Sequence, residues 1–267
     1  MRLVTFASGS GGNCSLVSGG DTHILIDAGI SMRRIKTALA SLGLHPDELS
    51  GVLITHEHRD HVAALATMLR QTGLRLYAPR TVANHLIWTV AGIEPRISII
   101  AAGADFGIDG LIVRAFHTSH DTDESVGYRI AGDGAVLGYC TDTGCVTADM
   151  LNALTGVDAA VIEANHDEEM LRYGSYPYIL KRRILSERGH LSNAACGELA
   201  VRLCAAGAVK LVLAHLSREN NRPDVALDTV ARCLAARGMH PELYVAPESG
   251  LLEIQVEGGA GVCCQSG

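Results

Sequence analysis

The sequence predicts an α/β protein built as an αββα four-layer sandwich, in which two sheets stack face to face and helices cover both outer faces. Short apolar runs typical of buried strands recur along the chain and alternate with segments of helical periodicity. Hydrophobic residues make up 48% of the 267 residues, which is enough for a substantial core. A doubly wound sheet would give the same pattern, so the choice between the two depends on the motifs described below.

Each expected element is based on a local pattern. Strands are expected where short apolar or β-branched runs lie between turn-forming residues, and helices where apolar residues repeat every three or four positions. Ser31 is expected to cap the first helix, and a glycine ends the second. In chain order we expect strands at 3–7, 15–19 and 23–28, a helix at 31–42, a strand at 51–55, a helix at 61–73, a strand at 74–78, a helix at 81–91, strands at 111–116, 127–132 and 135–140, a helix at 147–154, a strand at 159–164, helices at 177–186 and 192–206, a strand at 209–215, a helix at 223–237 and strands at 243–246 and 251–256.

The chain shows neither an internal repeat nor a low-complexity linker. We therefore expect a single domain over residues 1–256, followed by a flexible tail over 257–267. The formal net charge of −7 argues against a protein that coats nucleic acid through a basic surface. A site for divalent cations would make the local charge favourable for phosphate, because its ions would attract phosphate to a carboxylate-rich region.

The cysteine usage and the N-terminus bear on cellular location. None of the eight cysteines forms a C-x-x-C pair, and several lie inside apolar runs, so we expect free thiols in a reducing compartment. The N-terminal segment MRLVTFASGS is typical of a strand and not of a signal peptide. No apolar run is long enough to span a membrane. The sequence therefore predicts a cytoplasmic protein without membrane contact.

A cluster of metal-binding residue types directly follows a predicted buried strand. His56, Glu57, His58, Asp60 and His61 lie within six residues. Imidazole and carboxylate groups suit Zn, Mn and Fe, and residues two apart in a turn can point to the same side and bind one cation. Asp60 and His61 can then face a second cation. A polar loop that is rich in histidine by chance is the alternative, but the H-x-H-x-D-H spacing favours a metal site.

Further ligand candidates follow later strands. His117 and His120 come after one apolar run, Asp142 after the next, and His215 after a third. Strand ends present side chains at the rim of a sheet, where a site can form. Any one of these residues alone would more often be a turn residue, but their occurrence together in this order favours metal ligands.

The motif order resembles that of the metallo-β-lactamase superfamily: H-x-H-x-D-H, a distant His, an Asp in T-D-T-G, and a late His. The resemblance covers residues 1 to about 256 and implies the αββα fold and two divalent metal ions, Zn or Mn. It also implies that Asp142 bridges the ions and that Asp27 supports the site from behind its ligands. By the same resemblance, one ion is held by His56, His58 and His120, and the other by Asp60, His61 and His215.

The branch of the superfamily is indicated by the surroundings of the later ligands. The chain lacks the G-H-T-x-G motif of lactamases, lactonases and thioesterases, and its S-H-D and T-D-T-G motifs resemble those of nucleases and phosphodiesterases, which favours His120 over His117. The G-H-L-S-N stretch at His190 is similar to the G-H-S-T loop of transfer-RNA processing nucleases, in which the His is a candidate proton donor. The alternative for His190 is an ordinary residue at a helix start capped by Ser192.

Several motifs together resemble the WalJ (YycJ) family: S-G-S-G-G-N-C, E-A-N-H-D-E-E-M-L, G-H-L-S-N and H-L-S-R-E-N-N. This resemblance implies a 5′ to 3′ DNA exonuclease in which metal-activated hydroxide attacks phosphorus, Asp60 orients or deprotonates it and His190 protonates the leaving oxygen. RNA or a small nucleotide is the alternative substrate. Lactone or thioester hydrolysis and a non-catalytic, metal-binding regulatory role remain further alternatives.

Substrate contacts are predicted less directly. A glycine-rich turn over 8–13 could bind phosphate through its backbone, or could be a plain turn. The run Lys181 to Arg183 is the best local candidate for a nucleic-acid backbone, although such a run is often a solvated helix face. No basic, aromatic-rich face is evident, and the gap from Asp142 to His215 is too short for the clamping domain of related RNA nucleases. The predicted substrate contacts are Ser10, Asn13, His166, Asn193, Arg218 and Asn220, with loop and helix caps as the alternative.

Overall fold

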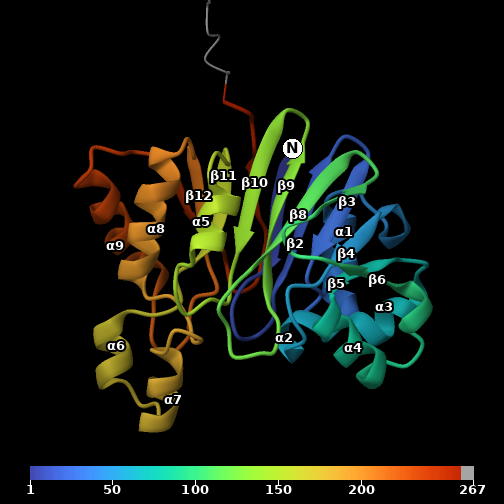
Figure 1. Ribbon diagram of the computed structural model, residues 1–267, viewed down its shortest axis with the longest axis horizontal. Coiled ribbons are helices and arrows are strands. Elements are labelled where there is room, and N and C mark those ends of the chain that lie inside the picture. The colour runs from blue at the N-terminus through green and yellow to red at the C-terminus, as the bar shows by residue number, and fades with distance from the viewer. Residues whose placement is uncertain (260–267) are drawn as a thin grey trace, which may run out of the picture.

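A computed structural model describes residues 1–259, and its centre consists of two stacked mixed sheets (Figure 1). The first sheet has the strand order β14-β1-β2-β3-β4-β5-β6, and the second has the order β13-β12-β11-β10-β9-β8-β7. In each sheet, antiparallel pairing gives way to parallel pairing, at β3 in the first and at β10 in the second. The first sheet comprises β1 (Arg2–Ala7), β2 (Cys14–Gly19), β3 (Thr22–Ile26), β4 (Gly51–Leu53), β5 (Leu76–Pro79), β6 (Ile97–Ile100) and β14 (Leu252–Gln255).

The second sheet comprises β7 (Asp105–Ile108), β8 (Leu111–His117), β9 (Val126–Gly132), β10 (Ala135–Cys140), β11 (Ala159–Glu163), β12 (Lys210–Ala214) and β13 (Glu242–Val245). Helices cover the outer face of each sheet, as Figure 1 shows. The helices on the side of the first sheet are α1 (Met32–Ser41), α2 (Arg59–Val62), α3 (Leu65–Gln71) and α4 (Arg80–Thr89). Those on the side of the second are α5 (Ala148–Leu154), α6 (Glu168–Tyr173), α7 (Tyr178–Ile184), α8 (Asn193–Ala205) and α9 (Pro223–Ala235). The predicted αββα four-layer sandwich is therefore confirmed.

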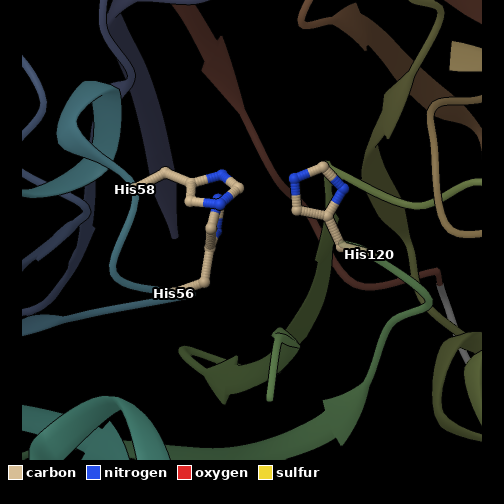
Figure 2. A group of neighbouring side chains, drawn as sticks. All are labelled: His56, His58 and His120. Atoms are coloured by element: carbon tan, nitrogen blue, oxygen red, sulfur yellow. The ribbon is translucent and has the colours of Figure 1, made fainter. Parts of the chain in front are cut away.

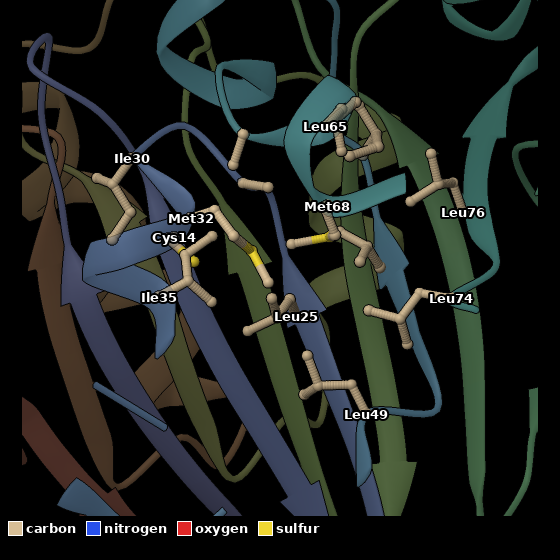
Figure 3. Close-up of a cluster of buried hydrophobic side chains, with 14 of the residues drawn as sticks. Cys14, Leu25, Ile30, Met32, Ile35, Leu49, Leu65, Met68, Leu74 and Leu76 are labelled. Carbon is tan, nitrogen blue, oxygen red and sulfur yellow. The ribbon is translucent and has the colours of Figure 1, made fainter. Parts of the chain in front are cut away.

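Three apolar clusters fill the three spaces between the four layers. One lies between the two sheets and includes Leu3, Leu53 and Tyr128. The second lies between the first sheet and its helices, where Met32 and Ile35 of α1 pack on Leu25 (Figure 3). The third packs α5, α8 and α9 on the second sheet. Central strands such as β2, β4 and β11 are buried along their whole length, which explains why they are apolar runs without alternation.

Some elements differ from the predictions. The expected helix over 61–73 is broken into α2 and α3, because the chain bends at Ala64, whose N–H donates to the Ala28 carbonyl at 2.9 Å. The short strands β6 and β7 were not predicted, since each has only four residues and gives too short a pattern to recognise. Helix α6 was also missed. Asp167 caps it, with its side chain accepting from the N–H of Glu169 and Met170.

The end of the chain returns to its beginning, because β14 pairs with β1. The predicted tail begins just after this strand, but the N–H of Gly259 still donates to Asp158 Oδ1 at 2.8 Å. The rest of the predicted flexible tail lies outside the described residues. No helix among residues 1–259 is long and apolar enough to cross a membrane.

Candidate metal centre

The candidate ligands meet where the central strands of both sheets end. His56 to His61 follow β4, His120 follows β8, Asp142 follows β10 and His215 follows β12. This edge is the lower one in Figure 1, next to α2. Parallel strands in each sheet end on the same side, so segments far apart in the sequence deliver side chains to one place.

Three residues at this edge have left-handed backbone conformations, which are uncommon for residues other than glycine. Their φ angles are 60° at Asp27, 58° at Asp142 and 58° at His215. Such conformations cost about 1–3 kcal/mol each and persist only where the surrounding structure enforces them. Each of these residues lies one or two positions after a strand, so the turn directs the side chain across the sheet edge into the site.

The turn after β4 is held tightly against the first sheet. The Asn13 backbone N–H donates to the Asp60 carbonyl at 2.7 Å, and the Ala28 N–H donates to the His61 carbonyl at 2.8 Å. Gly29 lies directly against this turn, because a Cβ there would be 1.6 Å from the Asp60 carbonyl oxygen. Only glycine at position 29 therefore lets the turn approach this closely.

His56, His58 and His120 surround a common space, and Figure 2 shows the three rings turned toward it. The ring centroid of His56 lies 4.5 Å from that of His58 and 5.0 Å from that of His120. His117, the competing candidate, is exposed on β8 and is not part of this group.

The described residues form four groups whose ligand atoms all lie within 4.8 Å of one another. Two of these groups are the two ligand sets that the resemblance implied. Asp142 lies between them, with Oδ2 3.4 Å from His61 Nε2 and Oδ1 3.9 Å from His120 Nε2. The groups are His56/His58/His120, Asp60/His61/His215, His56/His61/Asp142, and Asp142/Glu163/His190/His215.

The histidines in the centre are oriented through Nδ1, which leaves Nε2 directed inward. Such supporting contacts fix the tautomer of a metal-binding histidine and its ring orientation. The Nδ1 atoms lie 3.0 Å from Thr55 Oγ1 for His56, 2.7 Å from Asp27 Oδ2 for His61, 3.2 Å from the Gly189 carbonyl for His120, and 2.9 Å from Glu163 Oε1 for His215.

The inward atoms fit a divalent cation because several have no other partner. His56 Nε2, His215 Nε2 and Asp142 Oδ2 are buried and make no hydrogen bond. Buried polar atoms without a partner are costly, and a protein retains them where another group satisfies them. Imidazole nitrogens and carboxylate oxygens together suit Zn and Mn.

Glu163 at the end of β11 was not among the predicted site residues. It is fully buried, and its Oε1 accepts from His190 Nδ1 at 2.7 Å as well as from His215. Its Oε2 accepts from the Thr143 N–H at 2.9 Å. A charged residue closing an otherwise apolar strand was the signal that could have revealed it. Glu163 thus connects a candidate ligand, His215, to the predicted proton donor, His190.

The buried charges shift pKa values in a consistent pattern. Burial lowers the pKa of His61, but the carboxylates of Asp27, Asp142 and Asp60 outweigh burial and raise it to about 9. Burial and the neighbouring imidazoles lower the pKa of His56 well below its usual value. The buried carboxylates of this site therefore need a positive charge close to them, and a bound divalent cation can supply it.

Comparison with known proteins agrees with this arrangement. Residues 22–216 match the family described as the beta-lactamase superfamily domain. The chain is 36% identical over 239 residues to exodeoxyribonuclease WalJ of Streptococcus pneumoniae serotype 2, covering 86% of each chain. It is 35% identical to exodeoxyribonuclease YycJ of Bacillus anthracis, covering 89% of this chain and 90% of that one. The chain belongs to the WalJ/YycJ family of the metallo-β-lactamase superfamily.

The fold is also that of solved structures with little sequence similarity. The metallo-beta-lactamase fold protein YhfI from Bacillus subtilis superposes with a TM-score of 0.71 at 15% identity, covering 95% of this chain and 99% of that one. In this WalJ/YycJ-family chain the layers, and the strand ends that carry the candidate ligands, therefore follow the common superfamily architecture.

The remaining predicted site residues of this family member divide into two groups. Ser10 is exposed and lines a pocket with His190, so it is accessible to a ligand. Arg218 is exposed but paired with Glu248. The other four, Asn13, His166, Asn193 and Asn220, are at most 4% exposed.

The prediction of Asn13 and Asn193 as substrate contacts stays a prediction, and both side chains are buried with partners inside the protein. Asn13 Oδ1 accepts from the Gly9 N–H at 2.8 Å, and its Nδ2 lies 3.0 Å from His61 Nε2. The Asn193 side chain makes a reciprocal amide pair with Asn221. Both amides are occupied inside the protein and hold loops together. His166 and Asn220 are buried without side-chain partners and do not reach the surface.

Proposed function

We propose that this protein is a metal-dependent exodeoxyribonuclease that removes nucleotides from the 5′ end of DNA. The observation that carries the proposal is the convergence of a group of three histidines and a group of two histidines and Asp60 on either side of Asp142, with His190 beside them. The similarity to the exodeoxyribonucleases WalJ and YycJ supports DNA as the substrate.

We assign His56, His58 and His120 to one ion, Asp60, His61 and His215 to the other, and Asp142 to both. When bound, the ions would supply an activated nucleophile and charge neutralisation at phosphate. Zn and Mn both suit these donors. The six free cysteines among residues 1–259 support a reducing, cytoplasmic location.

The protein's own residues supply orientation and proton transfer. Asp60 is partly exposed, with 27% of its side chain accessible, so its carboxylate can orient or deprotonate the nucleophile. His190 lines the adjoining pocket, and its Nδ1–H donates to Glu163, which leaves Nε2 for the substrate. Burial lowers the pKa of His190, but the Glu163 carboxylate outweighs burial and raises it, which favours a protonated imidazole. A protonated His190 can give a proton to the departing sugar oxygen.

The first experiment is digestion of end-labelled DNA and RNA, single- and double-stranded, by Mn- or Zn-loaded protein. The Asp60→Ala variant serves as the matched control. We expect progressive loss of 5′-labelled DNA that the substitution abolishes. Digestion of RNA alone would redirect the proposal to ribonuclease activity, and turnover of only small phosphodiesters would redirect it to a nucleotide phosphodiesterase. Full metal content without any turnover would contradict an enzymatic role.

A further inference from the structure

Helices α6 and α7 and the short link between them, residues 168–185, form a projection that we call the α6–α7 arm. Figure 1 shows the arm extending beyond the lower edge of the second sheet, on the side where the central strands end. Its composition differs from that of the rest of the chain. Residues 168–185 contain four basic residues and two acidic residues, Glu168 and Glu169, in a protein whose formal net charge is −7. Three of the seven tyrosines, Tyr173, Tyr176 and Tyr178, also lie here.

The arm displays apolar side chains to solvent. Tyr173 is 80% exposed, Tyr178 is 74% exposed and Ile179 is 83% exposed. Arg182 is also exposed, and its guanidinium lies 5.9 Å from the centre of the Tyr178 ring. A cluster of exposed aromatic and apolar side chains is more typical of a binding site than of an ordinary solvated face. The basic, aromatic-rich surface that the sequence did not make evident is therefore present locally.

The arm is held in place against the protein body. Lys181 Nζ donates to the carbonyls of Arg172 at 2.9 Å and of Gly174 at 2.7 Å, which ties α7 to the end of α6. Gly174 is needed at the link, since a Cβ there would lie 2.6 Å from Asn220 Oδ1. Leu171 and Ile184 are buried beneath the helices. The exposed side chains are thus presented by anchored helices.

The inner side of the arm continues into the candidate active site. A pocket of about 200 Å³ is lined by Tyr176, Leu180 and Arg183 from the arm and by His120 and His190 from the centre. Arg183 also pairs with Asp121, next to the candidate ligand His120. The arm therefore forms one wall of the pocket beside His190 and also carries the exposed Tyr178 and Arg182.

We propose that the α6–α7 arm binds the unpaired strand of the nucleic-acid substrate, with bases stacked on its exposed tyrosines and phosphates held by its arginines. This inference rests on the proposed function and adds a substrate class, a single-stranded end or overhang. Proteins that bind single strands combine cationic grooves with aromatic platforms, because every base has a stackable face. Positive charge complements the backbone, and Arg can also stack on bases. A protein partner could use an apolar face, but it would not require the excess of four basic residues over Glu168 and Glu169 that the arm carries next to the candidate metal centre.

The test compares a Tyr178→Ala/Arg182→Glu variant with a Trp88→Ala/Arg237→Glu control. Trp88 is 90% exposed on α4, and Arg237 is exposed after α9, so the control removes one exposed aromatic residue and one exposed arginine from outside the arm. Binding of a fluorescent, phosphorothioate-linked single strand to the metal-loaded proteins is followed by anisotropy. Hydrolysis of bis(p-nitrophenyl) phosphate reports on the centre alone.

We expect the arm variant to bind the single strand at least about tenfold more weakly, as loss of one stacked base and one phosphate contact would cause. Its hydrolysis of the small ester should match that of the wild type, and the control should match the wild type in both assays. If the arm variant binds the single strand within about twofold of the wild type, the proposal is wrong, and a protein partner becomes the expected occupant of the arm. The anisotropy assay measures binding without cleavage. Wild-type protein that binds the single strand but digests no DNA would therefore contradict the exonuclease proposal and leave the role of the arm in binding unaffected.

Discussion

Each sheet contributes one fully buried carboxylate that supports the candidate centre, and the two carboxylates differ in what they hold. Asp27, after β3, accepts from His61 Nδ1 at 2.7 Å and from the Thr55 N–H at 2.9 Å. Glu163, ending β11, accepts from both His215 and His190 at 2.9 and 2.7 Å. Asp27 therefore contacts one imidazole, that of the candidate ligand His61. Glu163 contacts two, those of the candidate ligand His215 and the candidate proton donor His190.

The pKa shifts follow from this difference. Burial raises the pKa of Asp27, and its single imidazole partner does not reverse that effect. Burial also raises the pKa of Glu163, but the charges of His190 and His215 outweigh it and hold the pKa well below its usual range. If the proposed roles hold, Glu163 of the second sheet would link metal binding to proton delivery, whereas Asp27 of the first sheet would not. Five substitutions test this comparison.

The largest effect is expected where the two sheets meet, at Asp142. Asp142→Ala removes a carboxylate common to both candidate ion sites, so activity on DNA should fall by at least about a thousandfold, since metal catalysis supplies several kcal/mol. Metal content measured by mass spectrometry should fall with it. Full metal content in this variant would contradict the assignment of Asp142 to both ions.

His190→Asn should lower kcat for DNA by about 100-fold to 10,000-fold, the usual contribution of a general acid. The loss should be small for bis(p-nitrophenyl) phosphate, because p-nitrophenolate leaves without protonation. Metal content should not change. An equal loss on both substrates would argue that His190 acts on the centre and not on the leaving group.

Glu163→Gln and Asp27→Asn form the direct comparison between the two carboxylates. Each should weaken metal binding by about 10-fold to 100-fold, as changes to groups that orient metal ligands do. At saturating metal, only Glu163→Gln should lower activity on DNA more than on bis(p-nitrophenyl) phosphate. The same ratio of activities in both variants would show that the two carboxylates do not differ in function.

The smallest effect is expected for Asn13→Ala, behind the first sheet's ligands. The Gly9 N–H would lose its acceptor, and an unsatisfied buried donor costs about 1–3 kcal/mol. The free energy of unfolding in urea should fall by about this amount, while KM for DNA stays unchanged. A raised KM with unchanged stability would support Asn13 as a substrate contact.

The sequence alone determined the fold and the residue types of the centre. Apolar runs without alternation predict strands buried on both faces, and the H-x-H-x-D-H turn, Asp142 and His215 each follow such a run, whereas His120 follows the alternating strand β8. These signals are local, because a strand and the residue after it are adjacent in the chain. Where the local signal was weak, as in β6, β7 and α6, the prediction missed the element.

Only the tertiary structure decided which residues stand behind the ligands and which face the substrate. Glu163 and Asn13 are joined to their partners by contacts between segments far apart in the chain, and no local pattern distinguishes a buried amide from an exposed one. The same holds for the α6–α7 arm. Its tyrosines and arginines come from two short helices that are separate in the sequence. They lie together beside His190 because the two helices pack against each other.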